Sequence, residues 1–136
     1  MELKFPLRQE KSKILGKIYR PYAQVNLWSS KGKYWTEVWM IVDTGADYTL
    51  LPRYLAHDLK IDLEKGKIFS TSGIGGSERV YFFPKIKIKL GKWKREIPIG
   101  FLERNEIPPL MGRHLFLETF ETLFSSDHTV TFFVKE

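Results

Sequence analysis

The chain has 136 residues, of which 43% are hydrophobic and 15% aromatic, so it can bury a core as one domain and is not a disordered chain. It has no cysteine, no run of about 18 apolar residues and no start typical of a signal peptide, which excludes disulfides and thiolate metal sites and predicts a cytoplasmic protein without membrane contact. The formal charge of +6 indicates either a solvated basic surface or attraction to acidic partners or nucleic acid; the basic residues are spread along the chain and no nucleic-acid-binding motif is present, so a nucleic-acid partner is not expected.

The N-terminal part of the chain is predicted to be an extension followed by a β-hairpin. Residues 1–20 are charged and mixed, so we expect an N-terminal extension or strand there, with an exposed connection at residues 10–13, and we assign residues 21–136 to one domain. Residues 23–28 alternate small or apolar with polar side chains, which predicts a half-buried strand. After a turn, residues 34–42 are rich in aromatic and β-branched side chains and form the second arm of the hairpin.

The middle of the chain predicts one short helix and a long hairpin. Pro52 is well placed to open a helix, and Leu55 and Leu59, four residues apart, give that helix one apolar side. A glycine-rich segment at residues 72–77 lies between two strand-like runs and indicates the tip of a β-hairpin. Residues 84–90 alternate lysine with apolar side chains, which is typical of a strand with one solvated face.

The C-terminal part is predicted to combine a short buried strand, a helical turn and a last hairpin. Leu110 and Met111 form a short buried strand that ends at Gly112. Residues 114–120 form one or two helical turns, with Leu115 and Phe116 directed inward. A final hairpin ends with a strand at residues 129–134. Many short strands, frequent turns and one or two short helices predict a mainly β fold, either closed or sandwiched.

Asp43 is the candidate for chemistry. It follows an apolar run that reads as a buried strand, so its carboxylate lies where that strand leaves the core, and charged groups are rarely placed there unless they are paired or functional. Thr44 adds a hydroxyl that can donate and accept, and Gly45 allows a sharp turn and a close approach to a partner or substrate. The alternative is a strand-end aspartate that binds the amides of its own loop.

Three segments together resemble the retroviral-type (retropepsin-like) aspartic proteases. Residues 42–47, Val-Asp-Thr-Gly-Ala-Asp, resemble the active-site loop of that family, and residues 110–113, Leu-Met-Gly-Arg, resemble its second hallmark. Residues 72–77, Ser-Gly-Ile-Gly-Gly-Ser, resemble the glycine-rich tip of its flap. The segments occur in the family's order and at spacings suited to one subunit, over roughly residues 20 to 134. The resemblance implies a closed β-barrel subunit with one or two short helices.

The resemblance also implies an aspartic endopeptidase that works as a homodimer on a polypeptide substrate. One carboxylate can take a proton from water but cannot also polarise the peptide carbonyl, whereas two carboxyl groups that share a proton do both. Because the chain holds one Asp-Thr-Gly, the second aspartate is expected from a second copy, with the two Asp43 residues on a two-fold axis. In the resembled family, the residue matching Thr44 hydrogen-bonds across that axis, and the residue matching Gly45 offers its carbonyl to the bound peptide.

Supporting residues follow from the same resemblance. Ala46 belongs to the loop, and the family pattern implies an ion pair between Asp47 and Arg113, next to Gly112, with a structural role as the default for both charged residues. His114 departs from the Asn or Asp usual at that position and is interpreted as a tolerated variation. No metal and no cofactor are expected.

The flap hypothesis assigns mobility and close contact with a peptide to Gly73, Gly75 and Gly76. Ile74 then contacts substrate side chains, and Leu110 lines a subsite. The alternatives are a phosphate-binding loop and a plain hairpin turn. The segment lacks the Lys-Ser/Thr and the helix that follow a phosphate-binding loop.

A catalytically idle peptide-binding module is the rival function. The same fold can hold an extended peptide by strand addition, with Asp43 never meeting a second copy. A stable monomer favours this rival, and so does a C-terminal strand that folds back instead of pairing between chains. The tryptophans are interpreted as core or dimer-surface aromatics: Trp28, Trp35, Trp39 and Trp93.

Overall fold

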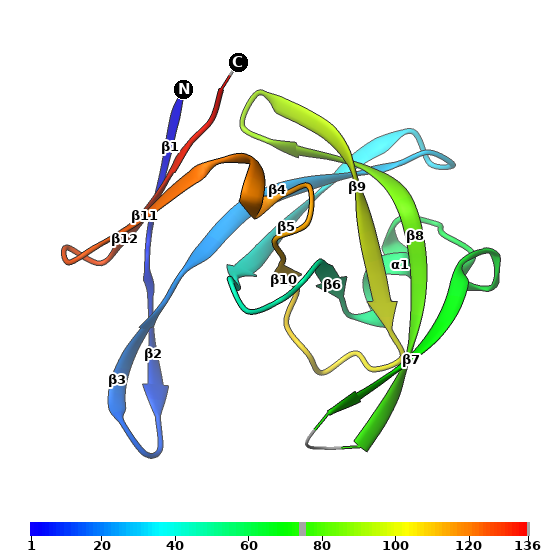
Figure 1. The fold of residues 1–136 in the computed structure, drawn as a ribbon, viewed down its shortest axis with the longest axis horizontal. Helices are drawn as coiled ribbons and strands as arrows, with labels where there is room; N and C mark the ends of the chain where they lie inside the picture. Colours follow the sequence, from blue (N-terminus) through cyan, green and yellow to red (C-terminus); the bar gives the residue numbers. More distant parts are fainter. Residues whose placement is uncertain (74–75, 136) are drawn as a thin grey trace.

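The computed structural model describes residues 1–73 and 76–135 and is almost entirely β-sheet (Figure 1). The strands are β1 (Glu2–Pro6), β2 (Arg8–Ser12), β3 (Gly16–Arg20), β4 (Tyr22–Ser29), β5 (Tyr34–Val42), β6 (Thr49–Leu51), β7 (Lys67–Gly73), β8 (Gly76–Leu90), β9 (Trp93–Leu102), β10 (Leu110–Met111), β11 (Glu121–Ser125) and β12 (Thr129–Phe133). The helical elements are α1 (Arg53–Asp58) and the 3-10 turns η1 (Leu63–Lys65) and η2 (Leu117–Thr119). The mainly β fold is therefore confirmed.

The body of the molecule is a closed barrel of six strands. The larger sheet runs in the order β4-β5-β10-β6-β9-β8-β7, and an additional pairing of β4 with β8 closes it. The strand β7 lies outside the closed ring, where it pairs with β8 to form the long hairpin at the bottom of Figure 1. Closure leaves β7 as the edge of this sheet.

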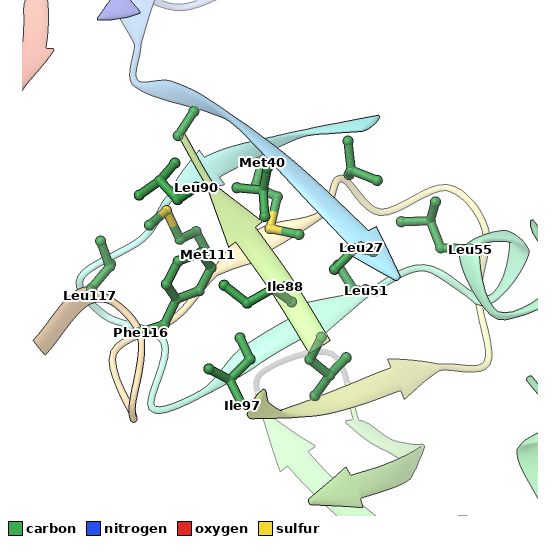
Figure 2. Packing of buried hydrophobic residues seen from close by; sticks show 14 of the residues in the cluster. Leu27, Met40, Leu51, Leu55, Ile88, Leu90, Ile97, Met111, Phe116 and Leu117 are labelled. Atoms are coloured by element: carbon green, nitrogen blue, oxygen red, sulfur yellow. The ribbon is translucent and has the colours of Figure 1, made fainter. Parts of the chain in front are cut away.

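Side chains that point into the barrel form a single core (Figure 2). Alternate residues of β4 are buried, as expected for a strand with one apolar face. Fully buried members from other elements include Met40, Ile88, Met111 and Phe116. Leu55 and Leu59 are both buried, so the expected apolar side of α1 is confirmed. At about 1.5–3 kcal/mol for each fully buried apolar side chain, this core is the main stabilising term.

The lysine-rich run at residues 84–90 is the second half of β8. Ile88 and Leu90 are buried, while Lys85 and Lys87 are exposed and Lys89 is half-buried, which confirms the strand with one solvated face. The two strand segments expected on either side of Pro84 form one continuous strand. The register with β9 shifts between Phe83 and Ile86, where proline cannot donate to the ladder.

The two ends of the chain lie side by side in a small second sheet of order β1-β12-β11. Glu2 is opposite Phe133 in this sheet, and the amino group of Met1 donates to the carbonyl of Val134 at 3.1 Å. The C-terminal strand therefore pairs on both sides within its own chain. The N-terminal residues are more ordered than expected, because the exposed connection predicted at residues 10–13 is partly β2, which pairs with β3 in a projecting hairpin.

The segment after Gly112 differs in part from the prediction. Phe116 is fully buried as expected, but Leu115 is 46% exposed and has a φ of 57°. The expected helical turns are limited to one 3-10 turn, η2, because the left-handed residue at position 115 prevents a continuous helix. In the described residues, no helix is long and apolar enough to cross a membrane.

Candidate active site

A parallel pairing of β5 with β10 brings two distant motifs together. Leu110 is opposite Ile41 and Met111 is opposite Val42, so Asp43 and Gly112 follow their strands at the same edge. The amide of Asp43 donates to the carbonyl of Met111 at 3.0 Å. The loop that starts at Asp43 is therefore attached to the segment of residues 110–113, as the family resemblance implied.

Asp43 itself is partly buried at the start of this loop. Its Oδ1 accepts a hydrogen bond from the amide of Gly45 at 2.9 Å, and its carbonyl accepts one from the amide of Ala46 at 3.2 Å. Among the described residues, no lysine or arginine lies within ion-pair distance of this carboxylate. Thr44 and Gly45 are exposed at the tip of the loop, where a second molecule can reach them.

Gly112 is the position where the two motifs pack most tightly. A Cβ at this residue would lie 2.2 Å from the carbonyl carbon of Tyr48 and 2.7 Å from the amide nitrogen of Thr49. Both atoms belong to the backbone, so only glycine fits without moving the loop. The amide of Gly112 donates to Oγ1 of the fully buried Thr49 at 3.1 Å, which satisfies a polar group inside the core.

Asp47 and Arg113 join the loop to the segment that follows Gly112. Nη2 of Arg113 donates to Oδ1 of Asp47 at 2.5 Å, so the ion pair that the resemblance implies is present. Two backbone bonds run alongside it, from the amide of Arg113 to Ala46 and from that of His114 to Asp47. Because the Asp47 and Arg113 side chains are 84% and 48% exposed, the ion pair itself adds at most about 1 kcal/mol to stability. The backbone bonds therefore do most to hold the loop.

A groove of about 680 Å³ lies against this assembly. Its lining includes Asp47 and Arg113 from the two motifs, Tyr48 directly after the first motif, and Phe82 from the hairpin strand β8. Burial, and then the charge of Asp47, raise the pKa of the Tyr48 phenol, so Tyr48 offers a neutral hydroxyl beside an apolar wall. Such a mixture suits the side chains of an extended polypeptide.

A family model described as "Aspartyl protease" matches residues 29–115, which is more than half of the chain and includes Asp43 and Gly112. The chain belongs to the aspartyl protease family. A comparison with curated proteins finds no significant match.

The fold of this aspartyl protease family member is similar to a solved structure of a retropepsin-like aspartic protease from Rickettsia conorii. The TM-score is 0.70 at 18% sequence identity, and the similarity covers 97% of this chain and 89% of the other. The retropepsin-like fold expected from the sequence is therefore confirmed.

The expected flap is the β7–β8 hairpin of this family member. The backbone pairing extends to Gly73 opposite Gly76, while Ile74 and Gly75 lie outside the described residues. Behind the tip, Arg104 donates from two nitrogens to Glu78 at 2.9 and 3.1 Å. Tyr81 donates to Glu103, which also accepts from Arg53 at 2.7 Å. These bonds fix the base of the hairpin to the end of β9 and to α1.

Several residues that shape the site were not predicted from the sequence. The groove is lined by Tyr48 and Phe82, and the buried Thr49 accepts a hydrogen bond from Gly112. Leu110, in contrast, was predicted to line a subsite and lies half-buried on β10, between β5 and β6. The position of Thr49 offered one signal, because a hydroxyl at the start of an apolar strand needs a partner once it is buried.

Proposed function

We propose that the chain is an aspartic endopeptidase that acts as a two-fold homodimer with one Asp43 from each copy. Two carboxyl groups about 3 Å apart cannot both ionise, so the pair shares a proton. One group takes a proton from water while the other gives its proton to the peptide carbonyl oxygen. The water oxygen bonds to the carbonyl carbon. The carboxyl group that took the proton from water then gives it to the leaving nitrogen as the carbon–nitrogen bond breaks, and no covalent intermediate with the enzyme forms.

The observation that carries this proposal is the attachment of the Asp43 loop to residues 110–113. The loop is held to this segment by three backbone bonds and by Gly112, yet the carboxylate has no cation beside it among the described residues. The bond from the Gly45 amide by itself fits the alternative of a strand-end aspartate. The family membership favours catalysis, and the groove, which is lined by Asp47 but not by Asp43, offers a place for substrate side chains.

The proposed roles of the other residues follow from their positions. Thr44 and Gly45 are exposed at the loop tip, where Thr44 would brace the partner's loop and Gly45 would bind the peptide backbone. Asp47 and Arg113 hold the loop. The roles of Leu110 and of the flap residues 73–76 as substrate contacts rest on the family resemblance. Apolar substrate side chains are the expected preference, because Phe82, Pro84 and Pro98 form part of the groove.

One observation favours the rival, a peptide-binding module without activity. The last strand, β12, is paired with β1 and β11 in its own chain, so it is not free to pair with a second copy. A dimer has to use other surfaces, such as the outer edge of β11, where Leu123 and Phe124 are exposed. An idle monomer would bind a peptide at an open edge such as β7.

Cleavage of an unstructured protein between about pH 3 and pH 7, at several enzyme concentrations, tests the proposal. We expect activity that rises faster than linearly with enzyme at low concentration, is blocked by a statine-type transition-state mimic and is lost in Asp43→Asn. Asp58→Asn, the same change on an exposed residue of α1, should keep it. A folded sample that sediments as a monomer and cleaves nothing would instead establish the binding module.

A further inference from the structure

The end of the barrel opposite the Asp43 loop carries two tryptophans surrounded by lysines. Trp28 and Trp35 are directly opposite each other on β4 and β5, with ring centroids 5.1 Å apart. Trp35 is eight residues before Asp43 on β5, so at about 3.3 Å per residue the two ends of this strand are on the order of 25 Å apart. This face is therefore separate from the candidate active site.

Three lysines lie over these two rings. Nζ of Lys89 is 4.4 Å from the centroid of Trp35, and that of Lys94 is 5.9 Å from the same ring. Nζ of Lys87 is 5.6 Å from Trp28 and 6.0 Å from Trp35. Cation–π contacts of this kind attract an ammonium group to the face of an aromatic ring. The rings thus hold several positive charges in one place.

These charges repel one another, and the chain offsets them only in part, through Glu96, which is directly opposite Lys87 in the β8–β9 pairing. Lys89 is directly opposite Lys94 in the β8–β9 pairing, and like charges in that position destabilise a sheet. Among the described residues, no carboxylate lies within ion-pair distance of Lys87, Lys89 or Lys94. The arginines nearer the flap, in contrast, are paired with Glu78 and Glu103.

Lys87, Lys94 and Trp28 line a groove of about 640 Å³, next to which Lys89 lies above Trp35. Its described lining holds one carboxylate, that of Glu96, and six basic side chains: Lys31, Lys60, Lys85, Lys87, Lys94 and Arg95. A hollow with walls of one sign concentrates its field on a ligand of the opposite sign. The groove, the unpaired lysines and the tryptophans together define the basic face.

We propose that the basic face binds an acidic segment of an extended polypeptide. Lys87 and Lys89 are two residues apart on one strand, so their side chains leave the same face about 6.8 Å apart. An extended peptide with an acidic residue at every second position repeats its carboxylates at the same spacing. Nucleic acid fits less well, because the tryptophans are half-buried and their rings already carry ammonium groups, which leaves little open ring face for a base.

This face would give the proposed protease a second contact with its substrate. An extended chain of about ten residues spans roughly 33 Å, which exceeds the distance from the basic face to the Asp43 loop along β5. Acidic segments at least that far from the cleaved bond would therefore anchor the substrate. This recruitment step rests on the proposed function, whereas binding of an acidic peptide does not.

The binding test uses the Asp43→Asn chain and a fluorescent peptide of alternating Glu and Ala, measured by anisotropy. We expect saturable binding that weakens as salt rises from about 50 to 300 mM. The double variant K89E/K94E should weaken binding about tenfold or more, since like-charge contacts cost several kcal/mol at worst. K89Q/K94Q, which removes the two positive charges without adding negative ones, should show a smaller loss in the same direction.

The matched control is K11E/K17E. It also reverses two lysines that face each other, but on the β2–β3 hairpin, so the net charge is the same as in K89E/K94E. Equal weakening by the two double variants, or no binding of the acidic peptide, would overturn the proposal. Tighter binding of an oligothymidylate of equal charge at the same salt concentration would assign the face to nucleic acid instead.

The recruitment step has its own readout in the active chain. A substrate with an alternating Glu-Ala segment should show a lower KM than one with Gln-Ala and an unchanged kcat, and K89E/K94E should abolish the difference. An inactive chain that still binds the peptide would refute the proposed protease and leave the basic face standing. An active chain with no preference between the substrates would refute recruitment alone.

Discussion

Replacing Gly112 with alanine tests whether the packing between the two motifs holds the active-site loop. The added Cβ would meet the carbonyl carbon of Tyr48 at 2.2 Å and its oxygen at 2.3 Å. Ordinary contacts begin near 3.4 Å, so the loop backbone has to move by about 1 Å. This movement also weakens the bond from the Gly112 amide to Thr49, which is 3.1 Å long and buried.

The two effects add. Overpacking costs about 1–3 kcal/mol and an unsatisfied buried amide about 1–3 kcal/mol, so we expect Gly112→Ala to lower the free energy of unfolding by roughly 3–5 kcal/mol. With a urea slope of roughly 1.5–2 kcal/mol per molar, the unfolding midpoint should fall by about 2 M. If the variant remains folded, a 1 Å shift of the loop should also reduce kcat/KM about a hundredfold.

Gly45→Ala is the control for stability. Its Cβ would meet only Oδ1 of Asp43, at 3.3 Å, and a side-chain atom can give way. We expect a loss below about 1 kcal/mol, measured in the same urea titration. Equal midpoints for Gly112→Ala and Gly45→Ala would refute the reasoning that backbone contact at position 112 positions the loop.

Three further predictions follow from buried groups. Thr49→Val keeps the shape but removes the acceptor of the Gly112 amide, so urea unfolding should show a loss of about 1–3 kcal/mol, and an unchanged midpoint would contradict this bond. Phe116→Ala empties a fully buried site and should cost about 3–5 kcal/mol, visible as a lowered melting temperature; a loss below about 1 kcal/mol would show that the core collapses around it. Burial and the charge of Asp47 raise the pKa of the Tyr48 phenol above 10.0 in the folded chain, so this group ionises at lower pH in the unfolded chain. Its contribution to the free energy of unfolding is therefore present below pH 10 and should fall as the pH rises further. Tyr48→Phe should lessen that fall in urea titrations at about pH 9 and 11, and an identical fall would exclude Tyr48 as its source.

The sequence predicted the elements whose patterns are local. The alternation at residues 84–90 and the apolar spacing of Leu55 and Leu59 are both present as expected. The fold was predicted through the resemblance of three segments, residues 42–47, 72–77 and 110–113, which occur in the family's order.

Other features depend on contacts that a linear pattern does not contain. Leu115 is apolar and was expected inside, but its left-handed backbone turns it outward and leaves Phe116 to fill the core. The charged N-terminal residues form strands in which β1 pairs with β12 and β2 with β3. In β1, the half-buried Leu3 and Phe5 alternate with exposed Glu2 and Lys4, a local pattern that the expectation of a charged, mixed extension did not use. Thr49 and Gly112 are neighbours only once β10 lies between β5 and β6.

The insertion of β10 between β5 and β6 has a consequence for how the protein is made. The aspartate is in the first third of the chain, but the residues that anchor its loop come about 70 positions later. Contacts this far apart in sequence form slowly, because a long loop has to close first. As the chain leaves the ribosome at about 5–20 residues per second, Asp43 therefore waits several seconds before residues 110–113 can dock. During synthesis, the carboxylate is present well before the site that could use it.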